Sequence, residues 1–72
     1  MRNLNWEQEE VNGKEFEFKA DCTAVENGTP YSLWDVQVKW PGQLDDFAVT
    51  YYDVYAEDKT DAVEQAFNRF DQ

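Results

Sequence analysis

The stretch from Glu15 to Ala24 alternates strictly between polar and apolar side chains, and this pattern constrains the fold more than any other feature. A period of two places one set of side chains on a buried face and the other in water, which is typical of a half-buried strand. The apolar set is Phe16, Phe18, Ala20, Cys22 and Ala24. We therefore predict a strand here, with Cys22 as a buried structural thiol without a reactive role.

A second strand is expected after a reversing turn. Asn27-Gly28 supplies residues that accept positive φ angles, so the run from Tyr31 to Trp40 should pair antiparallel with the first strand. Its core side would carry Trp34, Val36, Val38 and Trp40, and its water side Leu33, Asp35, Gln37 and Lys39. A third β-rich run extends from about Asp46 to Ala56.

The apolar period then changes from 2 to 3.6, which indicates a helix from about Lys59 to Phe70. Its apolar stripe consists of Val63, Ala66, Phe67 and Phe70. Asp58 is the expected N-cap, because a short carboxylate side chain can accept a hydrogen bond from the first free backbone N–H groups.

The N-terminal segment allows two interpretations. Read as a strand, the segment can pair with the next strand in two registers. A three-residue loop, Asn12-Gly13-Lys14, sets Trp6 opposite Ala20 and places Leu4 and Trp6 on the core face. A two-residue turn instead sets Glu9 opposite Phe16. Read as a short helix, the segment is capped by Asn5 and closed by Gly13. We prefer the strand.

These elements predict an α+β fold. Three or four antiparallel strands form a meander, and one C-terminal helix packs on one face of the sheet. Residues 1–72 form a single domain in this interpretation, because a chain of 72 residues leaves no room for a second core.

The third strand has two alternative faces. A dry core would penalise an unpaired Asp53, so we predict that Tyr52, Val54 and Ala56 point inward. The open face of the sheet would then carry an aromatic and apolar row: Phe47, Val49, Tyr51, Asp53 and Tyr55. Such a row is typical of an interaction site. Alternatively, a β-bulge near Tyr51-Tyr52 reverses the register, so that Phe47, Val49 and Tyr51 are core and only Tyr55 is exposed.

A formal net charge of −10 argues against direct contact with nucleic acid or a membrane, since both are bound through Lys and Arg. The predicted open face displays the carboxylates of Glu15, Glu17, Asp21 and Asp35, and the helix start displays those of Glu57, Asp58 and Asp61. Alternate strand residues lie about 6.7 Å apart, close to twice the spacing of phosphates on a DNA strand. This spacing permits phosphate mimicry; helix capping and ordinary solvation are the alternative explanation of each cluster.

The chain lacks histidine and has one cysteine, which excludes Cys/His zinc sites and Ser-His-Asp or Cys-His catalytic groups. No glycine-rich phosphate loop is present. We therefore expect no enzyme activity, no cofactor, and no catalytic or metal-binding residues. A single cysteine and the lack of a targeting or membrane-spanning pattern favour the cytoplasm.

The segment from Tyr55 to Ala62, Tyr-Ala-Glu-Asp-Lys-Thr-Asp-Ala, continuing to Phe67, is similar to the strand-to-helix passage of small podophage inhibitors of bacterial RNA polymerase. The size, acidity and aromatic content also resemble those of phage-encoded inhibitors that mimic DNA or block defence proteins, including some anti-CRISPR proteins. The resemblance implies an inhibitor acting in the host cytoplasm, and it transfers no position-specific motif.

The leading hypothesis is a small acidic binding protein, of phage or mobile-element origin, that occupies a basic nucleic-acid-binding surface of a host protein. Long-range attraction would speed association, and the aromatic row would supply short-range contacts. The alternatives are an assembly protein that forms a homodimer through its open sheet face and a small regulatory subunit of a host enzyme.

Overall fold

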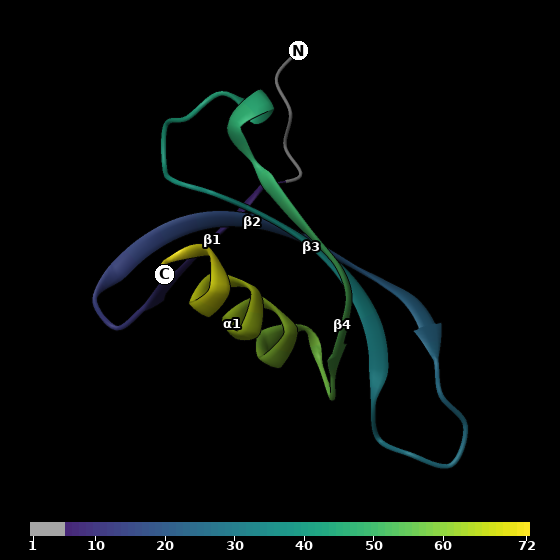
Figure 1. Ribbon diagram of the computed structural model, residues 1–72. Helices are drawn as coiled ribbons and strands as arrows, with labels where there is room; N and C mark the ends of the chain where they lie inside the picture. The colour runs from purple at the N-terminus through teal and green to yellow at the C-terminus, as the bar shows by residue number, and fades with distance from the viewer. Residues whose placement is uncertain (1–5) are drawn as a thin grey trace.

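The computed structural model describes residues 6–72 and contains a four-stranded sheet with one α-helix (Figure 1). The elements are β1 (Glu7–Val11), β2 (Lys14–Val25), β3 (Ser32–Lys39), a 3-10 helix η1 (Asp45–Phe47), β4 (Val49–Ala56) and α1 (Lys59–Phe70). The strands pair antiparallel in the order β1-β2-β3-β4, and α1 packs within the curve of the sheet. The predicted α+β meander is therefore confirmed in its four-stranded form.

The helix α1 has the predicted bounds and the predicted cap. Asp58 is extended, and its carboxylate accepts a hydrogen bond from the backbone N–H of Asp61 at 2.8 Å. The helix turns its apolar stripe toward the sheet and buries Ala62, Val63, Ala66 and Phe67, with Phe70 half-buried. Arg69 lies in the last turn, where a positive charge complements the helix dipole.

The core lies between α1 and the sheet. The strands contribute Phe16, Phe18, Val36, Val38, Val54 and Ala56. The ring of Phe16 stacks on that of Phe67 with 4.1 Å between centroids, and Trp40 meets Phe67 edge-on at 5.7 Å. Each fully buried side chain of this size contributes about 1.5–3 kcal/mol, so Phe67 does much to fix α1 on the sheet.

The segment before β2 is a strand, as predicted, but the turn that follows it is shorter than expected. Asn12 and Gly13 have φ angles of 56° and 81°, as in a two-residue type I′ turn. Glu9 consequently pairs with Phe16. The three-residue loop and the helical alternative are both wrong, because Asn and Gly tolerate two consecutive left-handed conformations and close the hairpin tightly.

The shorter turn also moves Trp6. We call the face of the sheet opposite α1 the open face. Trp6 lies there, with its ring 4.7 Å from Lys19 Nζ and 4.9 Å from Lys39 Nζ. The prediction that Trp6 opposes Ala20 in the core is thus wrong, because the register places it on the other face. The prediction for Leu4 falls outside the described residues.

β4 contains a bulge that reverses the side-chain alternation. Tyr51 pairs with Val36 on the core side, and Val54 is buried. Two residues, Tyr52 and Asp53, therefore separate consecutive inward-pointing side chains along β4, where a regular strand would have one. Asp53 adopts a φ of 57°, in the left-handed region that Asp tolerates better than most residues. The bulge therefore keeps the Asp53 carboxylate out of the core without placing Tyr51 in water.

The register predicted for the third strand is therefore wrong in part. Val54 and Ala56 point inward as expected, but Tyr52 lies on the open face and is 69% exposed. Tyr51 lies half-buried on the α1 side, as the bulge alternative requires, whereas Val49 shares this side but is 40% exposed and is not part of the core. Phe47 fits neither version, because it lies in η1 ahead of β4 and is 61% exposed.

Cys22 is exposed, which contradicts the prediction of a buried thiol. It pairs with Trp34 on the α1 side, but the end of the β2–β3 hairpin extends beyond the helix (Figure 1). A second irregularity between Cys22 and Ala24 then places Ala24 beside Leu33. The alternating pattern correctly predicted which face of the sheet carries Cys22. It did not predict that α1 leaves this end of the face uncovered.

Candidate partner-binding face

The open face collects charged and aromatic side chains from all four strands. Its cross-strand pairs are Glu10 with Glu15, Gln8 with Glu17, Glu17 with Lys39, Lys19 with Gln37, and Asp21 with Asp35. β4 adds Thr50 opposite Gln37 and Tyr55 opposite Leu33, and its bulge adds Tyr52. The sheet thus places side chains far apart in sequence on one surface.

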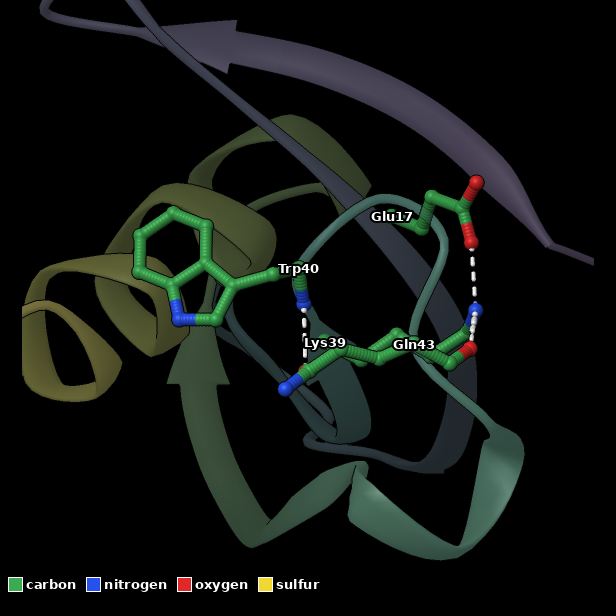
Figure 2. A network of polar contacts seen from close by, with 4 residues as sticks. All are labelled: Glu17, Lys39, Trp40 and Gln43. Atoms are coloured by element: carbon green, nitrogen blue, oxygen red, sulfur yellow. Dashed lines mark hydrogen bonds and ion pairs between the residues drawn. The ribbon is translucent and has the colours of Figure 1, made fainter.

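At one end of the open face, Lys39 is nearly buried, with 5% of its surface exposed. Its Nζ lies 2.6 Å from Glu17 Oε1 and donates a hydrogen bond to the backbone carbonyl of Gln43 at 2.7 Å (Figure 2). The Gln43 side chain in turn accepts a hydrogen bond from the backbone N–H of Trp40 at 3.0 Å. The turn after β3 is thereby tied to the ammonium group of Lys39.

Trp6 packs over this network. The ammonium groups of Lys19 and Lys39 both approach its ring at distances suited to cation–π contacts. Lys19 of β2 and Lys39 of β3 therefore lie beside one tryptophan, and Lys39 is neutralised by Glu17. Glu17, one of the predicted partner-binding residues, forms an ion pair within the fold.

The middle of the open face is acidic. Asp21 and Asp35 lie directly opposite each other on β2 and β3. Asp35 also accepts a hydrogen bond from the backbone N–H of Asp53 at 3.2 Å, which holds the bulge. These two carboxylates border a shallow hollow of about 220 Å³ that is also lined by Lys19, Gln37, Thr50 and Tyr52.

The acidic centre has no cationic partner within residues 6–72. The three ion pairs of this part of the chain join Lys39 to Glu17, Lys59 to Glu7, and Lys14 to Asp71. Like charges directly opposite on adjacent strands destabilise a sheet. Asp21 and Asp35 therefore form a local concentration of negative charge that the fold leaves open to solvent on one side.

The aromatic part of the open face differs from the predicted row. Tyr52 is 69% exposed beside the acidic hollow, and Tyr55 is 46% exposed nearer the end of the sheet. Tyr31 stacks on Tyr55 with 4.9 Å between ring centroids. Tyr55 is thus the one aromatic residue of the predicted row that lies on the open face with the acidic strand residues.

The remaining predicted residues are dispersed. Val49 and Tyr51 lie on the α1 side, and Phe47 lies in η1. At the helix start, Asp58 caps the backbone and Asp61 accepts a hydrogen bond from Gln65 Nε2 at 3.2 Å. Glu57 is exposed between β4 and α1. These helix-start carboxylates lie outside the open face, and two of them have structural roles.

Reasoning from sequence missed Tyr52, and it also missed Glu26, whose carboxylate accepts a hydrogen bond from the Tyr55 hydroxyl. This contact raises the pKa of the Tyr55 phenol above its ordinary value of 10.0, chiefly because the neighbouring carboxylate favours the protonated donor. A bulge in β4 would have placed Tyr52 correctly, whereas nothing in the local sequence links Glu26 to Tyr55.

Among residues 6–72, no three His, Cys, Asp or Glu side chains gather as potential metal ligands. In the same part of the chain, α1 is too short and too polar to cross a membrane.

No family model, curated protein or solved structure matches this chain.

Proposed function

We propose that the chain is a non-enzymatic binding protein whose open face occupies a basic, nucleic-acid-handling surface of a host protein. The observation that carries this proposal is the pair Asp21 and Asp35, opposite each other without a cationic partner and next to the exposed ring of Tyr52. A basic partner would relieve their mutual repulsion. The protein would act as an inhibitor encoded by a phage or mobile element, in the host cytoplasm.

Inhibition would be steric and electrostatic. A domain with a net charge of −10 is attracted over long range to a groove that normally binds phosphates. Once docked, Tyr52 and Tyr55 can contribute rigid contact area, since tyrosine combines a large ring with a polar tip. Charge would then govern the association rate, and the tyrosines would slow dissociation.

The test begins with affinity capture from host lysate and identification of the partner by mass spectrometry. The purified partner is then bound to labelled duplex DNA or RNA, and the acidic protein is added. We expect displacement of the nucleic acid and an affinity that falls steeply with added salt. A neutral or acidic partner, or an affinity indifferent to salt, would contradict the proposal.

A second candidate function is self-association, and exposed apolar residues in the connection before β4 favour it. Leu44 and Phe47 are 70% and 61% exposed in the connection that precedes this edge strand. Light scattering at low micromolar concentration separates monomer from dimer. Salt should strengthen a dimer of two acidic copies and weaken a complex with a basic partner, so the two functions predict opposite signs.

A further inference from the structure

The open face has a second, less polar hollow at the end of the β2–β3 hairpin. It measures about 270 Å³ and is lined by Ala24, Val25, Glu26, Leu33 and Tyr55. Four of these residues present apolar or aromatic atoms, and Glu26 supplies the only charge of the lining. We call this feature the Glu26 hollow.

The hairpin loop orients the Glu26 carboxylate. Its Oε1 atom accepts hydrogen bonds from the hydroxyl of Tyr55 and, at 3.2 Å, from that of Thr29. The same Thr29 oxygen accepts a hydrogen bond from the backbone N–H of Tyr31 at 3.2 Å, and the backbone N–H of Glu26 donates to the Tyr31 carbonyl. The carboxylate is therefore held from both the loop and β4.

The contacts of the described residues engage only the first oxygen of this carboxylate. Within residues 6–72, Glu26 Oε2 has neither a hydrogen-bond donor nor a cation as partner. A carboxylate offers about four acceptor positions, and the two hydroxyls on Oε1 leave those of Oε2 free. A fixed carboxylate with a free oxygen, next to apolar walls and a tyrosine ring, has the chemistry of a receptor for a cationic side chain with an apolar stem.

We propose that the Glu26 hollow binds an arginine side chain of the basic partner. This inference rests on the proposed function and names the contact that gives it specificity. The methylene stem would lie along Leu33 and Ala24, while the guanidinium would donate to Glu26 Oε2 and lie against the Tyr55 ring. Arginine suits this site better than lysine, because its planar cation is less strongly hydrated and stacks on aromatic rings.

The test uses three short peptides that differ only at the cationic positions, which carry arginine, lysine or the neutral arginine analogue citrulline. Binding to the full chain is measured by calorimetry and by NMR shifts of backbone amides. We expect the arginine peptide to bind most tightly and to shift the amides of Glu26, Leu33 and Tyr55. Equal affinity for arginine and lysine, or shifts confined to Asp21 and Tyr52, would overturn the inference.

A matched pair of variants tests the same contact. Glu26→Gln keeps the shape of the side chain and should weaken the arginine peptide about tenfold, because a charge-assisted hydrogen bond becomes a neutral one. Glu64→Gln makes the same charge change on an exposed position of α1, on the other side of the sheet, and should alter affinity less than about twofold. Amide spectra of both variants confirm that the fold is retained.

The outcomes separate the two proposals. If the captured partner still binds wild-type protein with strong salt dependence but Glu26→Gln binds as tightly as Glu64→Gln, the arginine receptor is wrong and the acidic-face function stands. If the wild-type protein binds neither a basic partner nor any of the cationic peptides, both proposals fail.

Discussion

Lys39 shows how a single residue can be assigned to the correct face of a strand and still have an unexpected environment. Alternation along β3 places it on the open face, where a lysine is ordinarily solvated. Trp6 and the Gln43 turn enclose it instead, leaving 5% of its surface exposed. Its ammonium group therefore depends on Glu17 for neutralisation, and this pair makes a testable contribution to stability.

Glu17→Gln should lower the free energy of unfolding by about 3 kcal/mol, because it leaves a buried ammonium group without a counter-charge. Lys39→Met in the same background should recover most of this loss, since a buried ion pair can be replaced by neutral side chains at little cost. Urea unfolding of wild type, both single variants and the double variant measures the coupling. Additive losses would show that the pair is not energetically coupled.

Tyr55 provides a pH-dependent prediction. Its hydrogen bond to Glu26 raises the phenol pKa above 10.0, so the native state holds this proton more tightly than the unfolded chain does. The resulting stabilisation is present in full below about pH 10 and is lost as pH rises through the raised pKa. Subtracting the phenolate absorbance titration of Tyr55→Phe from that of wild type isolates this residue.

Glu26→Gln serves as the control for this titration, because it removes the main cause of the shift while keeping a hydrogen-bond acceptor. The Tyr55 phenol should then titrate nearer its ordinary pKa, and the part of the alkaline loss of stability that Tyr55 causes should become smaller. An unchanged titration in Glu26→Gln would mean that the contact does not control the phenol.

At the scale of elements, α1 shows the clearest link between sequence and structure, because its stripe, cap and charges all indicate the same boundaries. Asp58→Ala should destabilise the protein by about 1 kcal/mol, since the N–H of Asp61 loses its acceptor. For a domain of this size that corresponds to a melting temperature roughly 4–8 °C lower. Thermal unfolding followed by circular dichroism measures the shift.

Asp58→Asn separates the cap from the charge. Asn caps helices about as well as Asp does, so this variant should retain most of the wild-type melting temperature. A loss as large as that of Asp58→Ala would assign the effect to the helix dipole instead of the hydrogen bond.

Sequence reasoning predicted best the elements whose hydrophobic pattern is compatible with only one buried face. The alternation in β2 and β3 and the helical period in α1 each allow a single buried face. The turn at Asn12-Gly13 had two acceptable lengths, and the pairing of β1 with β2 selected the shorter. That choice moved Trp6 to the open face, and the Asn12-Gly13 pair, which favours a two-residue type I′ turn, was the local signal for it.

The β4 bulge was a similar choice between two alternatives. Local burial costs favoured keeping Asp53 out of the core, and both registers satisfy that condition. The structure satisfies it by a left-handed Asp53, whose N–H is bound by the distant Asp35 carboxylate. The candidate site was therefore predicted in its acidic strand residues, but not in Tyr52 or Glu26, which depend on contacts across strands.

For the whole molecule, the net charge is −10, and the ion pairs within the fold neutralise some acidic side chains but not those at the centre of the open face. Lys39 pairs with Glu17 beneath Trp6, and Lys59 and Lys14 pair with Glu7 and Asp71, away from the centre of the open face. Neither Asp21 nor Asp35 forms an ion pair within the described residues, although Lys19 lines the same hollow. Their repulsion is a cost to stability that is expected where a surface is suited to binding a cationic partner.

This argument predicts opposite effects of one substitution on stability and binding. Asp21→Asn should raise the free energy of unfolding by about 0.2–1 kcal/mol, because it removes a like-charge pair across two strands. The same change should weaken binding to the basic partner and make its salt dependence less steep, because one attractive charge is lost. Urea unfolding and calorimetric titration at two salt concentrations measure the two effects.

Glu64→Gln is again the matched control, since it also removes one negative charge, at an exposed position of α1. If net charge alone governed both properties, the two variants would behave alike. A larger effect of Asp21→Asn than of Glu64→Gln on both stability and affinity would show that the position of the charge matters. The repulsion between Asp21 and Asp35 would then be a cost to the free protein that is relieved when the cationic partner binds the open face.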